Sequence, residues 1–427
     1  MNSGKRWKNK VLFKIIASSF ILRLMNIVFI ALGTLILAKI LPPIEFGTYS
    51  LIISYVAIII IPLQSGIPIL NIRIISSKKH PLIPLDLIKF TSITIIVYFF
   101  IISCIELMLD NILISPIADF RYLFYFLSLS TISISILSSY IQGLNHILQS
   151  QYIEQLIRPL LFILPIIIII YTKIAKLSYE NVLYLLSFSY IASSFIAFIY
   201  IYSHKRFCYE KIKKETKLIW IKSLIPLCSL TGLQVLLSQM DIIVLANIKN
   251  LESVAVYKIA TQFAVIVTLI STVIGVIIAP KINQLYNTDV EKLKLIVHYS
   301  NWLSLLSGVI LFTLFYFFSE YIITRLLTES YKDASTYLLI LCLGYIISTL
   351  FGPISTIVNM LSLEKFNLAS IAIAVITNLL LLILLVPFLG SLGAAISTAI
   401  STIIWKLTLT CFVKNKIRIP CYLKIKS

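Results

Sequence analysis

The sequence has few charged residues for its length. Of its 427 residues only 12% are Asp, Glu, Lys or Arg, whereas 59% are hydrophobic and the mean hydropathy is +1.00. An average soluble domain carries about a quarter charged residues. A soluble protein of this length could not bury so much apolar surface, and the composition also excludes a disordered chain and a collagen-like repeat. The chain therefore belongs in a lipid bilayer.

Several short motifs of enzymes and metal proteins are missing. The six cysteines are scattered without a CxxC pair, and the four histidines show no HExxH or comparable ligand spacing. This pattern excludes a disulfide-stapled secreted fold and predicts neither a metal site nor a cofactor. No nucleotide-binding motif occurs, which argues against direct use of ATP.

Long apolar runs, separated by proline, glycine and charge, predict twelve membrane-spanning helices. The first run extends to about residue 41 without a signal-peptide cleavage site, so we interpret it as a retained span. The expected spans lie near residues 15–40, 46–71, 87–108, 120–143, 150–172, 182–203, 219–247, 253–279, 297–318, 335–360, 366–386 and 391–412.

The net charge of +19 is unevenly distributed between the loops. In a soluble protein this charge would suggest nucleic acid, but cytoplasmic loops of membrane proteins are also rich in Lys and Arg. One set of loops, with both termini, holds most of these residues. The opposite loops hold only Lys39, Arg121, Lys173, Lys176, Lys249, Arg325 and Lys332. Both termini are therefore predicted to be cytoplasmic, and no nucleic acid partner is expected.

The densest positive charge divides the chain into two halves. We expect an N-terminal six-helix bundle over residues 1–204, a basic cytoplasmic linker over 205–218, and a C-terminal six-helix bundle with a basic tail over 219–427. The pattern Leu-Ala-x-Ile with a later Tyr, at 37–49, recurs at 245–257, in the corresponding place of the second half. This weak repeat favours a duplicated, parallel architecture, which is typical of transporters.

Polar residues follow one face of several predicted spans. Ser, Thr and Gly at spacings of three and four residues are explained by close helix packing alone. By contrast, the isoleucine run at 166–170 and the run 379–386 look lipid-facing. Charged and amide side chains at depth require another explanation, since an ionised group at mid-membrane costs about 2.5–3.5 kcal/mol.

Several such positions are candidates for substrate binding or coupling. Arg23 lies about 13 Å along the first span, beside Asn26 on the same face. Its planar guanidinium suits phosphate oxygens, although a structural ion pair with Asp241 is the alternative. Lys258 adds a second positive charge near the start of the eighth span, where an interfacial lysine is the alternative reading. We interpret Glu154 and Arg158 as an ordinary i,i+4 helix pair and Lys406 as a lysine that reaches the interface.

Four motifs in order resemble those of polysaccharide-biosynthesis membrane proteins, the Wzx-type flippases for O-antigen and capsule repeat units. Each motif alone is weak, but together they cover nearly the whole chain. They are Leu41-Pro42-Pro43-Ile44-Glu45-Phe46-Gly47-Thr48-Tyr49, Tyr140-x-Gln142-Gly143, Ser238-Gln239-x-Asp241 followed by Val254-Ala255-Val256-Tyr257, and Gly390-x-x-Gly393-Ala394-Ala395. Ala255 stands where the family usually has glycine.

The resemblance implies an all-α polytopic protein with two six-helix bundles in a V shape and alternating access to a central cavity. Its expected activity is flipping of undecaprenyl-diphosphate-linked oligosaccharides across the bacterial inner membrane, by a monomeric transport unit rather than an enzyme. A polysaccharide polymerase and a chain-length regulator are expected partners, besides membrane lipids. The expected substrate-binding residues are Arg23, Asn26, Gln234, Lys258 and Gln262, with Asp241 for coupling to a proton or sodium gradient.

Three other functions remain open. A cation-coupled exporter of multidrug and toxin extrusion type is the main alternative, which Asp241 favours and the absence of an acid in the first span disfavours. A lipid II flippase of the same superfamily usually has fourteen spans. A repeat-unit polymerase or ligase would need a large outer loop, and the loops of this chain are short.

Overall fold

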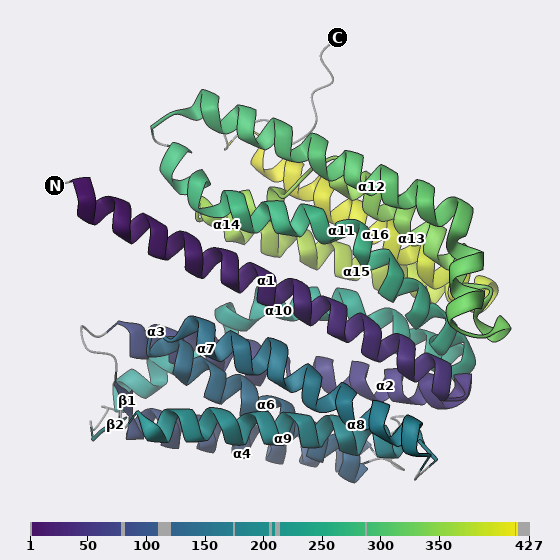
Figure 1. Ribbon diagram of the computed structural model, residues 1–427, viewed down its shortest axis with the longest axis horizontal. Coiled ribbons are helices and arrows are strands. Elements are labelled where there is room, and N and C mark those ends of the chain that lie inside the picture. Colours follow the sequence, from purple (N-terminus) through teal and green to yellow (C-terminus); the bar gives the residue numbers. More distant parts are fainter. Residues whose placement is uncertain are drawn as a thin grey trace. The chain divides into compact units, whose positions relative to one another are not determined.

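The computed structural model describes residues 2–77, 82–109, 121–173, 176–204, 207–209, 214–286, 288–414 and 416. Nearly all of these residues form helices, which are labelled in Figure 1. The elements are α1 (Asn2–Ile40), α2 (Pro43–Ile59), η1 (Pro62–Gly66), α3 (Ile67–Ser76), β1 (Ile83–Pro84), α4 (Leu85–Leu109), α6 (Arg121–Gly143), α7 (Ile147–Tyr152), η2 (Ile153–Ile157), α8 (Arg158–Thr172), α9 (Tyr179–Ser203), β2 (Phe207–Cys208), α10 (Lys214–Ile248), α11 (Leu251–Tyr286), α12 (Val290–Leu326), η3 (Glu329–Tyr331), α13 (Ala334–Thr349), α14 (Ile354–Met360), α15 (Glu364–Leu389) and α16 (Ser391–Val413).

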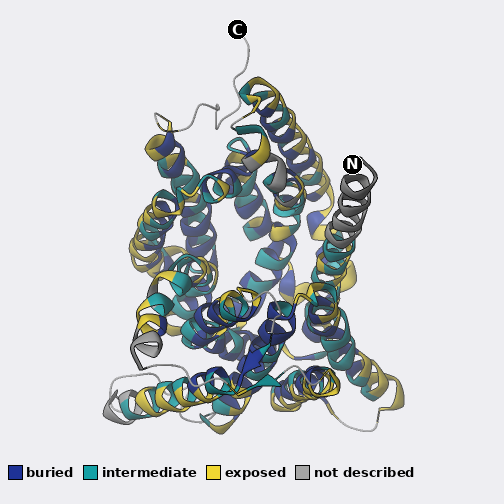
Figure 2. Ribbon diagram, turned by 90° about the vertical axis from the view of Figure 1, so that its left-hand side faces the viewer, coloured by how far each residue is buried: buried dark blue, intermediate teal, exposed yellow. Residues whose placement is uncertain are grey.

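The predicted spans are confirmed as helices. Within the described residues ten helices are long and apolar enough to cross a membrane, and the total is twelve if each of two bent helix pairs is one span. Large hydrophobic side chains are exposed along many of these helices, and yellow exposed positions follow their outer sides in Figure 2. In water such exposure would be unfavourable, so these faces fit contact with lipid. The chain is a multi-pass membrane protein.

Two of the spans are bent, which the sequence pattern did not predict. α2 meets the segment of η1 and α3 at 59°, where Pro62 begins a π-helical turn. The segment of η3 and α13 meets α14 at 44°, where Gly352 has φ +52° and Pro353 caps the next helix. Proline lacks an N–H donor, and glycine adopts positive φ at no steric cost, so each break follows from its local sequence.

Contacts between helices divide the chain into two compact units. Unit 1 comprises residues Met1–Gly33 and Val56–Gly232, and unit 2 comprises Thr34–Tyr55 and Leu233–Ser427. The end of α1 and the start of α2 thus group with the C-terminal helices, and the first half of α10 groups with the N-terminal ones. The sequence placed the boundaries at 204 and 219 instead, and much of the expected linker and of the basic tail lies outside the described residues.

Unit 1 is built around α6. This helix packs against α3 and α9, and its Ser128, Thr131, Ser135 and Ser138 are buried. The Ser128 and Ser135 hydroxyls donate to carbonyls four residues earlier, so the serine stripe serves packing. β1 pairs in parallel with β2. This pairing holds the loop before α4 against the loop after α9. These two loops therefore lie on the same side, as the charge pattern predicted.

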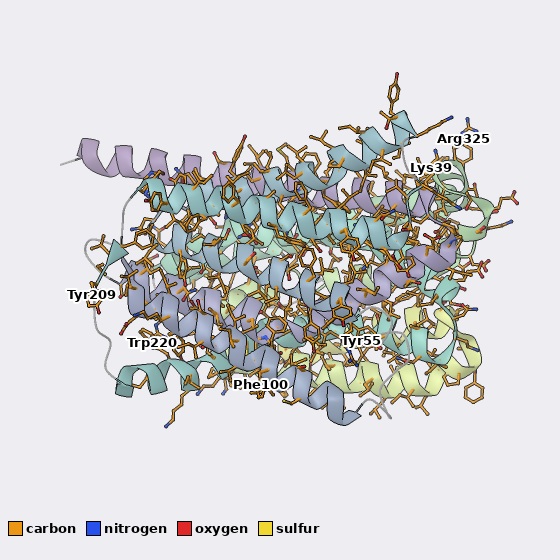
Figure 3. All side chains as sticks on the ribbon, turned by 90° about the horizontal axis from the view of Figure 1, so that it is seen from below. Lys39, Tyr55, Phe100, Tyr209, Trp220 and Arg325 are labelled. Atoms are coloured by element: carbon orange, nitrogen blue, oxygen red, sulfur yellow. The ribbon has the colours of Figure 1, made fainter. Side chains whose placement is uncertain are left out.

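In unit 2 the helices α11, α12, α13, α15 and α16 pack against one another. Lys39 and Arg325 lie at the same end of the unit in Figure 3. Lys249 also lies at an end where loops meet, because its Nζ donates to the Pro387 carbonyl at 3.0 Å. The hairpin between α15 and α16 turns at Gly390, which has φ +59°. The expected outer loops of unit 2 thus converge at one end of that unit.

The two copies of the weak sequence repeat contact each other at this end. A Cβ placed on Gly47 would lie 1.9 Å from the Leu251 carbonyl oxygen. Only glycine allows the start of α2 to approach the start of α11 so closely. Beside it, Phe46 is fully buried and its ring meets that of Tyr331 edge-on at 6.4 Å. The Phe-Gly-x-Tyr motif is therefore a packing motif in this unit.

Replacing Gly47 with alanine is expected to lower the free energy of unfolding by about 1–3 kcal/mol, because the added methyl must displace backbone. The measurement is the thermal unfolding midpoint of the purified protein in detergent. Gly33→Ala is the matched control, since its added Cβ would lie 3.7 Å from Ile163, an ordinary contact. Equal unfolding midpoints for the two variants would contradict the close-packing argument.

Candidate functional site

Unit 2 contains a cavity of about 480 Å³ lined by α10, α11, α13 and α16. The volume lies in the range of small-molecule sites in proteins. Four of the residues expected from sequence share this cavity, namely Gln234 and Asp241 on α10 with Lys258 and Gln262 on α11. Their helical spacing placed them on one face of each helix, and packing brings the two faces together. The unit thus presents a polar cavity inside an otherwise apolar bundle.

Asp241 holds four helices together in the cavity wall. It is only 2% exposed. Its Oδ2 accepts hydrogen bonds from the Thr398 hydroxyl at 2.5 Å and the Tyr257 hydroxyl at 2.8 Å, and its Oδ1 accepts from Asn378 Nδ2 at 2.7 Å. These partners come from α16, α11 and α15. Both carboxylate oxygens are therefore partnered within unit 2 by neutral groups.

The amide of Asn378 completes this cluster in an unusual way. Its Oδ1 is buried and has no hydrogen-bond partner among the described residues. The cluster thus gathers a carboxylate, two hydroxyls and an unsatisfied amide oxygen. Hard oxygen groups of this kind can hold a proton or a small hard cation. A lone buried acceptor is costly and calls for an explanation of its presence.

Two lysines supply positive charge to the same cavity. Lys258 and Lys406 both line it and are partly buried. Lys406 Nζ donates to the Ser355 hydroxyl at 2.9 Å and lies 4.1 Å from the centre of the Trp405 ring. Within the part of the chain that the structure describes, neither ammonium forms an ion pair with a carboxylate. A cavity with such lysines favours an anionic ligand.

The position of Lys406 corrects the sequence interpretation. Its side chain was expected to reach the membrane interface, but it lines the cavity, seven residues before the end of α16. Lys258 lies seven residues after the start of α11. With both helices starting at the same end of the unit, the two lysines differ by about 12 Å in axial height at 1.5 Å per residue. The positive charge therefore extends along the cavity.

The remaining lining is polar and aromatic. Gln234 and Ser238 on α10 are exposed to the cavity. The Trp405 indole donates from Nε1 to Asn367 Oδ1 at 3.1 Å, which fixes the ring. Amides, hydroxyls and a flat aromatic face are groups that bind sugars through hydrogen bonds and apolar contact. The cavity can therefore accept a polar uncharged group besides an anion.

Arg23 and Asn26 lie on α1 in unit 1 and do not line this cavity. Arg23 is exposed, whereas Asn26 is partly buried and its Oδ1 has no partner among the described residues. Their proposed contact with substrate stays a prediction. The ion pair considered for Asp241 is not needed, because its oxygens have partners from its own unit.

The expected helix pair of Glu154 and Arg158 is present only as an electrostatic interaction without a close contact. No close ion pair joins these described residues, and Arg158 lies over the Tyr190 ring at 5.1 Å. The reason is the π-helical turn η2, which begins at Ile153. Bonding from i to i+5 widens the turn, so residues four apart no longer lie directly above each other.

Sequence reasoning missed Asn378, Thr398 and Trp405. Asn378 precedes an apolar run in α15 that we interpreted as lipid-facing. That interpretation is right only for one face, since Leu380 and Leu384 are exposed whereas Leu382 and Val386 are fully buried. A single amide beside an apolar run was the available signal, because buried polar groups in a membrane need partners.

Comparison with known proteins gives two family matches. The sequence matches the family described as Polysaccharide biosynthesis protein over residues 11–286 and the MatE family over residues 226–384. A search of curated proteins gives no match.

Three solved structures share the fold over most of their length. A lipid II flippase MurJ in an inward closed conformation has a TM-score of 0.72 at 16% identity, covering 95% of this chain and 87% of that one. An inward-facing multidrug resistance MATE family transporter of the MOP superfamily has a TM-score of 0.68 at 13% identity, covering 93% and 98%. A Pyrococcus furiosus MOP superfamily transporter, whose binding pocket is described as reversed in polarity, has a TM-score of 0.58 at 14% identity, covering 94% and 95%. These likenesses establish the fold, that of MOP-superfamily transporters and flippases.

The polysaccharide biosynthesis match extends over more than half of the sequence and includes parts of both units. It also includes α10, which carries Asp241, and α11, which carries Lys258. The chain therefore belongs to the polysaccharide biosynthesis protein family.

Proposed function

We propose that this protein flips undecaprenyl-diphosphate-linked oligosaccharide repeat units from the cytoplasmic to the outer leaflet of the bacterial inner membrane. The observation that carries the proposal is the cationic cavity of unit 2, in which Lys258 and Lys406 lack an acidic partner among the described residues. A diphosphate supplies the missing negative charge, and charge-assisted hydrogen bonds to it are strong. Gln234, Gln262 and Trp405 supply groups that suit the sugars.

The same cavity disfavours an exporter of cationic drugs. Two ammonium groups repel a cationic substrate, and the carboxylate of Asp241 is taken up by Tyr257, Thr398 and Asn378. In unit 1 Arg23 and Asn26 are further proposed contacts for the diphosphate, and their side chains come from the polar face of α1. A transporter of this kind catalyses no covalent step, and a polysaccharide polymerase with its chain-length regulator would use its product.

We propose that the ion gradient that drives transport acts through binding of a cation at Asp241. The oxygen groups around its carboxylate, including the unpartnered Asn378 Oδ1, suit a proton or a sodium ion. Binding of a cation neutralises a buried charge, so it changes the stability of the packing between α10, α11, α15 and α16. That coupling gives an ion gradient a route to the transport cycle.

The test is lipid analysis of a strain without this gene, complemented from a plasmid. We expect diphosphate-linked repeat units to accumulate and surface polysaccharide to disappear. A leaflet-accessibility assay then separates flipping from polymerisation. Complementation by Arg23→Ala is expected to restore export only weakly at normal protein level. Normal surface polysaccharide with intracellular accumulation of toxic cations would instead identify a drug exporter.

A further inference from the structure

Unit 1 contains a second cavity, separate from the site described above. It measures about 600 Å³ and is lined by α1, α7, η2 and α9. Its walls are mostly hydrocarbon, with Ser18 and Gln149 as the polar side chains among them. The main lining side chains are Ile21, Leu22, Tyr152, Ile153, Ile157 and Ile196.

The cavity is a groove that opens where α1 leaves α8. At Gly33 the two helices approach each other, since a Cβ there would lie 3.7 Å from the Phe162 and Ile163 side chains. Leu22 lies three helical turns before Gly33, or about 16 Å along the axis. At that level α1 faces α7, η2 and α9 across the groove. The space beside α1 is therefore narrow near Gly33 and wider near Leu22.

The groove lies within membrane-spanning segments. Its walls belong to the spans Ser18–Ile40, Ile147–Thr172 and Tyr179–Ser203. At one edge the Tyr200 hydroxyl is hydrogen-bonded to His146 Nδ1 at 2.7 Å. The Tyr200 hydroxyl therefore already has a hydrogen-bond partner, and the Tyr200 ring is the part that lines the groove. Hydrocarbon is the occupant that such a surface accommodates without loss of hydrogen bonds.

The groove also adjoins the polar face of α1. Leu22 lines the groove, and the next residue, Arg23, is turned about 100° around the helix. The apolar groove and the predicted diphosphate contact thus lie at the same depth on neighbouring faces of one helix. A lipid with a charged diphosphate and a long hydrocarbon tail needs these two surfaces beside each other.

We propose that this groove holds the prenyl tail of the lipid-linked substrate while its diphosphate and sugars lie on the polar side of α1. The inference rests on the proposed function and adds a tail-binding site to it. The volume of about 600 Å³ accommodates part of one hydrocarbon chain, whereas a partner helix has a diameter of about 10–12 Å.

The test fills the groove in the full-length protein. Ile196→Trp places an indole in it, and Ile157→Trp does so from the opposite wall. Ile191→Trp is the matched control, because Ile191 is exposed on the same helix, α9, but does not line the groove. Binding of undecaprenyl diphosphate, geranyl diphosphate and dioleoylphosphatidylglycerol is measured by native mass spectrometry, with the unfolding midpoint as a check on folding.

Filling the groove is expected to weaken undecaprenyl diphosphate binding about tenfold, which corresponds to the loss of roughly two buried methylene groups. Binding of geranyl diphosphate and of the phospholipid should stay within twofold, and Ile191→Trp should bind all three like the wild type. Unchanged undecaprenyl diphosphate binding in both filled variants would overturn the tail site alone. An equal loss of the phospholipid would identify a site for general membrane lipid. Failure of the wild type to bind either diphosphate would overturn the proposed function as well.

Discussion

Asp241→Asn is expected to abolish the gradient-driven part of transport while leaving the protein folded. The asparagine keeps an oxygen that accepts from Asn378, and its amide can donate to the hydroxyls of Tyr257 and Thr398, which also accept. The hydrogen-bond network therefore survives with its directions rearranged. The negative charge is lost, and with it the affinity for a proton or sodium ion. We expect a change in unfolding free energy below about 1 kcal/mol.

The measurement is flipping of lipid-linked oligosaccharide in proteoliposomes under an imposed proton or sodium gradient. Asp289→Asn is the matched control, since Asp289 is an exposed helix cap that accepts from the Lys292 amide, a role that asparagine also fills. Asp241→Ala should in addition lose about 3 kcal/mol, because several buried donors lose their acceptor. Gradient-stimulated flipping by Asp241→Asn at the wild-type rate would show that the cluster is structural.

The second large effect is expected from the two lysines of the cavity. Lys258→Gln and Lys406→Gln should each weaken the apparent affinity for the diphosphate-linked substrate about 10- to 100-fold. A hydrogen bond to a charged group contributes about 1.5–3 kcal/mol, and 1.4 kcal/mol corresponds to a factor of ten. Because glutamine retains polarity and most of the side-chain length, the loss mainly reports charge. The measurement is the concentration dependence of flipping, with geranyl diphosphate as a soluble competitor.

Lys332→Gln is the control for this pair. Lys332 is exposed and forms an ion pair with Glu320 at 3.0 Å on the outside of unit 2. Exposed pairs of this kind contribute little to stability, so flipping should stay within twofold of wild type. If the cavity variants transported the anionic substrate normally and a cationic dye better, the drug-exporter function would replace the proposed one.

The positions of the spans could be predicted from the sequence because the bilayer imposes a length and a polarity on every crossing segment. The expected span at 391–412 agrees with α16, and that at 219–247 with the apolar part of α10. The bends at Pro62 and Gly352 were not predicted. Both lie inside continuous apolar runs, and hydropathy does not register a backbone break.

Half of the cavity could also be found from the sequence. Spacing on α10 and α11 identified Gln234, Asp241, Lys258 and Gln262 as side chains of two polar faces. Asn378 and Lys406 were missed or misread because their partners come from other helices. Lys406 meets Ser355 of α14, which lies far away in sequence. Helical periodicity shows which residues share a face, but it does not show which faces meet.

The sequence by itself determined that this chain crosses a membrane many times, and its motifs pointed to the polysaccharide flippases. Both conclusions depend on residue composition and on the order of residues in short motifs, which can be read without knowing how the helices pack. Only the tertiary structure decided that Asp241 joins four helices, that Lys406 faces a cavity and that α1 and α2 contribute Thr34–Tyr55 to unit 2. These facts depend on contacts between segments distant in sequence, where small residues such as Gly47 set how closely two helices approach.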